Sequence, residues 1–215
     1  MKKRIFVTAT NTDIGKTYTT KLLLKEYASR GIRVGVMKFI ETGVVDGIYP
    51  DGDILLSLIQ ELNPEFANIK VEDIVPISYE MAASPFVASG AEPIDFELLS
   101  KAMEKLEEFC DILIIEGAGG LLVPLDKNFM IVDLISFFQI TTLLVTHCSL
   151  GCINDTLLSL NVLTQRDISA IVAFNCRESD SDFCQTSEPY FKEIGYDVLK
   201  VDSNIDTICD VLYNP

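Results

Sequence analysis

The sequence predicts a single-domain α/β fold with a mostly parallel central sheet and helices on both faces. Three observations lead to this prediction. Short apolar runs of strand length alternate with helix-length amphipathic segments. The clearest of these runs, Ile112–Ile115, is continuously apolar and ends in Glu116, as expected of a central parallel strand. The chain has 215 residues, a size that fits one domain, assigned here to residues 1–215.

The first strand and helix enclose a candidate phosphate-binding loop. Ile5–Val7 predicts a short buried strand, and a small polar loop from Thr8 to Ile14 follows it. Gly15-Lys16-Thr17 then opens a helix with an apolar side at Leu22–Leu24. The N–H groups of such a loop and first helical turn converge on one point, where the helix dipole favours an anion.

The residues of this tripeptide have distinct roles in phosphate binding. Gly15 lets the backbone approach a phosphate closely, Lys16 reaches the outer phosphates, and the Thr17 hydroxyl can hold Mg²⁺. Thr10 stands where the strict pattern G-x-x-x-x-G-K-[ST] has its first glycine. The alternative is therefore an ordinary strand-turn-helix connection that contains Gly-Lys-Thr by chance.

The remaining elements follow in order along the chain. We expect a strand over 33–38, a loop over 39–52, a helix over 53–62, an edge strand near 74–77, a helix start at 84–85 and a helix from 94 to about 109. We then expect a strand over 111–116 with a glycine-rich loop over 117–120, a strand over 141–146, a helix to about 163 and a strand over 170–174. The tail predicts a polar stretch over 177–188, a short helix, a strand near 198–199 and a last helix ending at Tyr213.

The composition describes a globular protein that is strongly acidic. Hydrophobic residues make up 48% of the chain, charged residues 23%, and the net charge is −15 at pH 7. This charge opposes binding to nucleic acid or to an anionic membrane, so we expect neither partner. No apolar run approaches the ~20 residues of a membrane span, and no signal-peptide hydrophobic region precedes the first strand. These features predict a cytoplasmic protein.

The cysteines and the histidine suggest no catalytic motif of their own. No C-x-x-C pair occurs, and in a reducing cytoplasm we expect free thiols. The six cysteines are Cys110, Cys148, Cys152, Cys176, Cys184 and Cys209. His147 is the only histidine, so a Ser-His-Asp triad would have to include it; its place after an apolar run favours a strand end or a core position.

The carboxyl ends of the predicted strands gather residues suited to phosphate chemistry. Ligands of open α/β sheets bind outside these ends. There we expect Lys16 and Lys38 to face one crevice together with Glu116. Mg²⁺ prefers oxygen ligands, which Thr17, Glu116 and Asp53 at a helix start could supply together with nucleotide phosphates.

Simpler roles exist for three of these residues. Asp53 could cap its helix, and the sequence leaves this role and the metal role equally open. Glu116 could be a buried acid with a partner, and Lys38 could extend its ammonium group into solvent. Beside a phosphate loop, the metal role for Glu116 and transition-state stabilisation for Lys38 are the favoured interpretations.

The motifs together resemble one known family, the dethiobiotin synthetases, which are P-loop ATP-dependent enzymes. The resemblance covers residues 4–175, in the same order and with similar spacing. The matching segments are Phe6–Thr17, Lys38 with Thr42-Gly43, Asp53, Glu116–Gly120, Leu150–Asn154 and Asn175. The chain departs from the family at Ala9 (usually Gly), at Asp13 (usually Glu) and at Cys176-Arg177, where Asp-Val-x-Pro-Pro often follows the asparagine.

The resemblance implies an ATP- and Mg²⁺-dependent cyclo-ligase. Enzymes of this family close the ureido ring of dethiobiotin from 7,8-diaminononanoate and CO₂, through a carbamate and a carbamic-phosphoric mixed anhydride. They are homodimers with shared active sites, and the segment matching Leu150–Asn154 binds the substrate carboxylate for the partner subunit.

Carried over to this sequence, the family implies a role for each matching residue. The catalytic residues would be Lys16, Lys38 and Thr12, and the metal ligands Thr17, Asp53 and Glu116. The nucleotide-binding residues would be Asp13, Ile14, Gly15, Lys16, Thr17, Tyr18, Asp53, Glu116, Gly117, Ala118, Gly119, Asn175 and Cys176. The substrate-binding residues would be Thr12, Thr42, Leu150, Gly151, Cys152, Ile153 and Asn154.

Three other functions are compatible with a phosphate loop. A regulatory or partitioning P-loop ATPase switch would carry a second lysine in the loop, where Thr10-Asn11-Thr12 stands instead. A small-molecule kinase would need a lid with arginines, and no arginine lies in an evident lid. A non-catalytic nucleotide-binding module is the third alternative.

Overall fold

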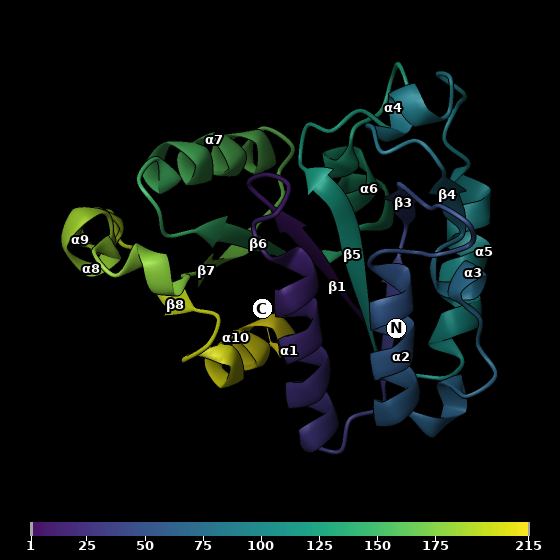
Figure 1. Ribbon diagram of the computed structural model, residues 1–215. Helices are drawn as coiled ribbons and strands as arrows, with labels where there is room; N and C mark the ends of the chain where they lie inside the picture. The colour runs from purple at the N-terminus through teal and green to yellow at the C-terminus, as the bar shows by residue number, and fades with distance from the viewer. Residues whose placement is uncertain (1, 215) are drawn as a thin grey trace.

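A six-stranded sheet forms the centre of the computed structural model, which describes residues 2–214 (Figure 1). The strand order is β2-β5-β1-β6-β7-β8, and every ladder in this sheet is parallel. The strands are β1 (Lys3–Ala9), β2 (Val34–Lys38), β5 (Ile112–Gly120), β6 (Thr141–His147), β7 (Ala170–Asn175) and β8 (Leu199–Lys200). The predicted α/β fold is confirmed. The domain limits 1–215 remain a prediction, since residues 1 and 215 lie outside the described part.

Helices cover both faces of the sheet (Figure 1). The helices α1, α2 and α10 pack in one layer, with α1 between the other two, while α5, α6 and α7 cover the opposite face. The helices are α1 (Lys16–Ser29), α2 (Gly52–Leu62), α3 (Val71–Ile74), α4 (Pro85–Ala88), α5 (Phe96–Glu107), α6 (Ile131–Phe138), α7 (Cys152–Thr164), α8 (Phe183–Thr186), α9 (Glu188–Glu193) and α10 (Ile205–Tyr213). Two short 3₁₀ turns cover Pro64–Phe66 and Glu178–Asp180.

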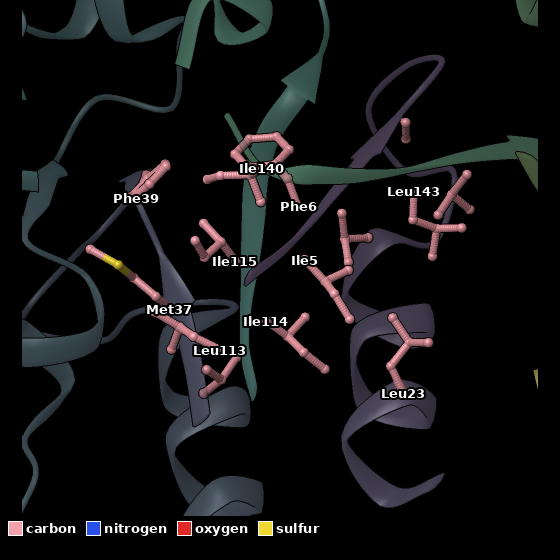
Figure 2. Packing of buried hydrophobic residues seen from close by; sticks show 14 of the residues in the cluster. Ile5, Phe6, Leu23, Met37, Phe39, Leu113, Ile114, Ile115, Ile140 and Leu143 are labelled. Carbon is pink, nitrogen blue, oxygen red and sulfur yellow. The ribbon is translucent and has the colours of Figure 1, made fainter. Parts of the chain in front are cut away.

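The core lies between the sheet and these two layers (Figure 2). Ile112–Ile115 of β5 is fully buried between β1 and β2, which explains its continuous apolar sequence. Phe6 on β1 packs near Phe39, with ring centroids 6.0 Å apart. Rigid packing on both faces of β1 and β5 fixes the carboxyl ends of these strands, where the functional residues lie.

Three local predictions need correction. The segment 39–52 is not all loop, because β3 (Ile40–Thr42) pairs in parallel with β4 (Ile77–Tyr79) in a separate two-stranded sheet. The edge strand expected at 74–77 therefore begins three residues later, after α3. The glycines at 117–120 continue β5 instead of forming a loop, with a register shift opposite Val7 and Ala9.

The helix α6 was not predicted, although its sequence carries the signal. Ile131, Val132, Leu134 and Ile135 are all buried on one face, with helical spacing. The helix is only 8 residues long and mostly apolar, so its pattern resembles that of a buried strand. In the tail, two short helices, α8 and α9, stand where one was expected.

The expectation of six free thiols is wrong for two cysteines. Cys148 and Cys176 form a disulfide, while Cys110, Cys152, Cys184 and Cys209 are free. The bond follows from strand register. His147 of β6 pairs with Asn175 of β7, so the next residue on each strand lies beside the other, with the Cα atoms 4.9 Å apart.

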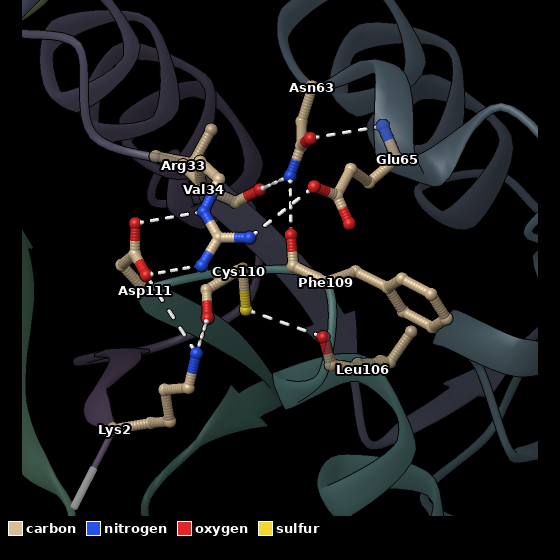
Figure 3. A network of polar contacts seen from close by, with 9 residues as sticks. All are labelled: Lys2, Arg33, Val34, Asn63, Glu65, Leu106, Phe109, Cys110 and Asp111. Atoms are coloured by element: carbon tan, nitrogen blue, oxygen red, sulfur yellow. Dashed lines mark hydrogen bonds and ion pairs between the residues drawn. The ribbon is translucent and has the colours of Figure 1, made fainter.

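Polar contacts join β2 and β5 at the amino ends of these strands (Figure 3). The Asn63 side-chain amide donates to the carbonyls of Val34 and Phe109, at 2.7 and 3.0 Å. The Arg33 guanidinium forms a two-pronged ion pair with Asp111. These contacts hold the amino ends of β2 and β5 together, away from the phosphate loop.

Within residues 2–214, no helix is both long enough and apolar enough to cross a membrane.

Candidate active site

The loop between β1 and α1 has the backbone geometry of an anion cradle. Gly15 caps α1 in the left-handed region, with φ of 103°, and Asp13 also has positive φ. A Cβ atom on Gly15 would lie 2.1 Å from Nδ2 of Asn175, which donates to the carbonyl of Ile14 at 2.7 Å. Only glycine therefore fits this position. The first turn of α1 contains no acidic residue, so its N–H groups remain open to an anion.

Lys16 is folded over this loop. Its side chain is nearly buried, and its ammonium group donates to the carbonyl of Asn11 at 3.2 Å. Burial lowers the pKa of Lys16 from the usual lysine value, although the charge of Glu116 opposes this shift. A largely buried cation with few protein partners is well placed to bind phosphate.

A compact charged cluster joins the carboxyl end of β2 and Glu116 of β5 to the starts of α1 and α2. Lys38 donates to Oε1 of Glu116 at 3.0 Å and also to the carboxylate of Asp51. The Thr17 hydroxyl lies 2.8 Å from Oε1 of Glu116 and 3.0 Å from Oδ1 of Asp51. Four side chains from four separate parts of the chain thus meet at one point.

The charges in this cluster stabilise one another. Burial alone would lower the pKa of Lys38, but the charges of Glu116 and Asp51 outweigh it and raise that pKa above the usual value. Burial likewise acts to raise the pKa of Asp51, and the nearby Lys38 reverses this effect, so the pKa of Asp51 is lowered. Lys38 is therefore cationic and Asp51 anionic at neutral pH.

The Asp53 side chain lies outside this cluster. Its side chain is exposed, and its carboxylate accepts from the N–H of Tyr49 at 2.9 Å, before the helix start. Residues two apart on a helix point in directions about 200° apart, so only one of Asp51 and Asp53 can face the cluster. Asp51 is that residue, and it also precedes α2 as its N-cap. The carboxylate predicted at Asp53 is supplied by Asp51.

A second acid that was not predicted, Glu41, binds the backbone of Asp51. Glu41 on β3 is 2% exposed, and its two carboxylate oxygens accept from the N–H groups of Asp51 and Gly52, at 2.5 and 3.0 Å. Burial raises the pKa of Glu41 even though these hydrogen bonds oppose the shift. A Cβ atom on Gly52 would lie 2.9 Å from Glu41, so glycine allows this contact. The start of α2 is thereby anchored to β3.

The cluster offers the oxygen ligands that Mg²⁺ prefers. Glu116 is fully buried, and its Oε2 has no hydrogen-bond partner within residues 2–214. A buried carboxylate oxygen without a partner is costly unless a cation binds it. Those residues contain no group of three or more His, Cys, Asp or Glu side chains arranged to hold a metal. The available donors, Thr17, Asp51 and Glu116, therefore fit an ion that keeps several waters and binds phosphate oxygens.

A cavity of about 730 Å³ opens onto this cluster. Predicted site residues Thr12, Asp13, Gly15, Lys16, Thr17, Lys38, Thr42, Ala118 and Gly119 line it. They are joined by Ile40, Glu41, Pro50, Asp51, Ala82, Ala83, Ser84, Pro85, Val123 and Arg177. The lining thus combines charged and polar groups with small and apolar side chains. This combination suits a ligand with a polar reacting end and an aliphatic chain.

Several predicted nucleotide-binding residues lie outside the cavity lining. Gly117 packs on Phe6, where a Cβ atom would lie 3.0 Å from the ring. The Tyr18 side chain is 45% exposed, and its hydroxyl contacts Asp202 at 2.5 Å. Asn175 contacts the loop through Ile14, and Cys176 is in the disulfide.

The segment Leu150–Asn154 lies at the start of α7, with Leu150, Gly151 and Asn154 exposed and Cys152 buried. Gly151 caps this helix with φ of 103°, and the Leu150 side chain is 93% exposed. None of its residues lines the cavity of the same chain. Within one chain, therefore, the structure does not bring this segment to the phosphate loop.

Three charged residues at the cavity were not predicted from the sequence: Asp51, Glu41 and Arg177. Local signals existed for each of them. Asp51 shares a turn with Asp53, Glu41 follows Lys38 closely, and Arg177 lies two residues after the end of β7. Tertiary packing decides which of these side chains face inward.

The fold and the phosphate loop define a P-loop ATPase-type α/β protein. A family model described as an AAA domain matches residues 3–212. The fold resembles a plasmid partition protein from Borrelia burgdorferi (TM-score 0.59, 10% identity, 99% of this chain and 98% of that one). It also resembles a ParA family ATPase from Chlorobium tepidum TLS (TM-score 0.54, 15% identity, 99% and 92%).

Sequence relatives define the family more closely. An ATP-dependent dethiobiotin synthetase from Sulfurovum sp. (strain NBC37-1) is 42% identical over 190 residues, covering 88% of this chain and 90% of that protein. The synthetase of Wolinella succinogenes is 34% identical over 213 residues, covering 98% of each chain. That of Thermodesulfovibrio yellowstonii is 37% identical, covering 88% and 82%. The chain belongs to the ATP-dependent dethiobiotin synthetase family, as its motifs predicted.

Proposed function

We propose that this cavity closes the ureido ring of dethiobiotin from 7,8-diaminononanoate, CO₂ and ATP, with Mg²⁺. The observation that carries the proposal is the meeting of Lys38, Asp51, Glu116 and Thr17 beside the phosphate loop. Family membership supplies the reaction, and the cavity supplies groups suited to each part of it.

The proposed reaction has three steps. One substrate amine adds to CO₂ and loses a proton, which gives a carbamate. A carbamate oxygen then attacks the γ-phosphorus of ATP, and ADP leaves. The second amine attacks the carbonyl carbon of the mixed anhydride, loses a proton and expels inorganic phosphate as the ring closes. Each ring formed consumes one ATP.

The two lysines stabilise the charge that develops in these steps. Phosphoryl transfer depends mainly on positioning and on cationic stabilisation of the phosphate oxygens. Lys16, folded over the loop, would bind the outer phosphates in the ground state and the transition state. Lys38, held by two carboxylates at the strand end, would face the transferred group. Thr12 and Thr42, which line the same cavity, would hold the carbamate by hydrogen bonds.

Thr17, Asp51 and Glu116 are the residues that would hold Mg²⁺. When bound, the ion would neutralise charge on the β- and γ-phosphate oxygens. The partnerless oxygen of Glu116 supports this assignment. Asp51 replaces Asp53 in the proposed ligand set.

We further propose that the enzyme is a homodimer with shared active sites. Leu150–Asn154 lies away from the cavity of its own chain, and its helix start offers N–H groups to an anion. A partner subunit could place this segment at the far end of the cavity, where it would bind the substrate carboxylate.

A partition-type ATPase switch is not favoured. The likeness to partition proteins is at 10–15% identity in the structures compared above, which indicates a common fold alone. The relatives at 34–42% identity are synthetases.

One incubation tests the proposal. The protein is mixed with diaminononanoate, bicarbonate, Mg²⁺ and ATP, and cyclic urea and phosphate are measured together, with Lys38→Ala as the control. We expect equal amounts of both products from the parent chain. Phosphate release without cyclic urea would indicate a switch or a different ligase instead.

A further inference from the structure

Arg177 lines the cavity, although no family motif includes it. It follows Asn175 and Cys176 at the carboxyl end of β7, and it faces the same space as Lys16 and Thr12. The sequence departs from its family at this point, where Cys176-Arg177 replaces the usual continuation.

Two hydrogen bonds and the disulfide of the preceding residue hold Arg177 in place. Its Nη2 donates to the carbonyl of Asp13 at 2.5 Å, which ties the β7 end to the phosphate loop. Its backbone N–H donates to Oδ2 of Asp180 at 2.9 Å. The preceding residue, Cys176, is covalently joined to Cys148 on the neighbouring strand. The side chain therefore starts from a restrained backbone beside the loop.

The cations of the cavity differ in their partners. In the cavity, Lys38 is paired with Asp51 and Glu116. Within residues 2–214, neither Lys16 nor Arg177 forms an ion pair, and the hydrogen bonds of both side chains go to loop carbonyls. A guanidinium has five N–H donors, so several remain for a ligand after the bond to Asp13.

The net charge of the protein makes such cations important. At −15, the molecule as a whole repels a polyphosphate. Lys16 and Arg177 supply two positive charges on the cavity wall that form no ion pair within residues 2–214, next to N–H groups of the loop. Guanidinium groups bind phosphate through paired, charge-assisted hydrogen bonds.

We propose that Arg177 is a phosphate-binding residue, which contacts the polyphosphate chain of the nucleotide from the β7 side of the loop. This inference rests on the proposed use of ATP. Its ligand class is the nucleoside di- and triphosphates. Because a phosphate contact does not read the base, Arg177 strengthens the binding of every such nucleotide by a similar factor.

Equilibrium binding without diaminononanoate tests this role. The probes are ATP and inorganic triphosphate, measured by calorimetry with Mg²⁺ present. We expect Arg177→Gln to weaken both ligands about tenfold to hundredfold, as expected for hydrogen bonds to a charged group. Arg177→Lys, which keeps the charge but loses the paired hydrogen bonds, should weaken both ligands clearly less than Arg177→Gln does. The matched control Arg166→Gln removes an arginine that pairs with Asp133 away from the cavity, and should change neither affinity.

The variants separate phosphate binding from two other roles. If Arg177 only clamped the loop, Gln and Lys could both donate to the Asp13 carbonyl, and the two variants would behave alike. If it stacked on the base, ATP would weaken and inorganic triphosphate would not. Either result overturns the proposal, as does parent-like binding by Arg177→Gln. Because no turnover is measured, failure to form cyclic urea would count against the proposed function alone.

Discussion

Oδ1 of Asp51 lies 3.0 Å from the hydroxyl of Thr17, across 34 residues of sequence. This contact joins the start of α2 to the first turn of α1, at the point where a triphosphate would lie. It also places Asp51, and not Asp53, among the proposed metal ligands.

We expect Asp51→Asn to lower turnover by at least about 100-fold and to raise the Mg²⁺ concentration needed for half-maximal rate, because an anionic ligand is lost. Asp53→Asn should stay within about threefold of the parent, since its carboxylate meets only the N–H of Tyr49. Mg²⁺ titrations of both variants provide the measurement. An equal loss of turnover in the two variants would indicate that Asp53 also binds the metal.

Lys38→Ala and Lys16→Ala should each reduce kcat by about 10²–10³-fold, as for other preorganised groups that stabilise developing charge. Lys16→Ala should also weaken nucleotide binding, since Lys16 meets phosphates in the ground state. Steady-state kinetics and calorimetry separate the two effects, with thermal melting to confirm folding. A Lys38→Ala enzyme within threefold of the parent rate would remove Lys38 from the mechanism.

Glu41 should act as a positioning residue for Asp51. Glu41→Ala leaves the N–H groups of Asp51 and Gly52 without their acceptors, which costs about 1–3 kcal/mol each, so the melting temperature should fall by roughly 4–24 °C. We expect the KM for Mg²⁺ to rise as well, and Glu41→Gln, which keeps one acceptor, to be intermediate. The control Glu97→Gln alters an exposed ion pair on α5 and should change neither quantity. A lower melting temperature with an unchanged KM for Mg²⁺ would limit Glu41 to a structural role.

Two inactive chains should complement each other if active sites are shared. Lys16→Ala disables the loop, and Gly151→Ala strains the start of α7, because Gly151 has φ of 103°. After co-refolding at equal amounts, half of the dimers are mixed and each has one intact site. Activity should therefore reach about a quarter of the parent value. Proven mixed dimers without activity would contradict a shared site.

Nucleotide selectivity should be weak. Asn175 is bonded to the loop carbonyl of Ile14, and the family's proline-containing continuation is replaced by Cys176-Arg177. Each missing neutral hydrogen bond to the base is worth about 1 kcal/mol, so losing two reduces base discrimination by roughly thirtyfold. We expect kcat/KM for GTP and CTP comparable with that for ATP. A preference for ATP above about a hundredfold would mean that other tail residues read the base.

The sequence by itself determined the features that depend on neighbouring residues. The apolar run of β1, the tripeptide Gly15-Lys16-Thr17 and the first helix identify the phosphate loop, because its N–H groups and glycine act within a few residues. The continuous apolar run Ile112–Ile115 likewise predicts the buried strand that carries Glu116, although this strand continues to Gly120. The order of these motifs then sufficed to predict the family.

Tertiary structure alone decided contacts between distant segments. The choice of Asp51 over Asp53 depends on which side of α2 faces Lys38, and the packing of α2 sets that side. The pairing of β3 with β4, the Cys148–Cys176 bond and the approach of Arg177 to Asp13 each join segments whose local sequences give no sign of one another. Local sequence specifies the chemistry that a side chain can perform, whereas packing across the sheet decides where that side chain points.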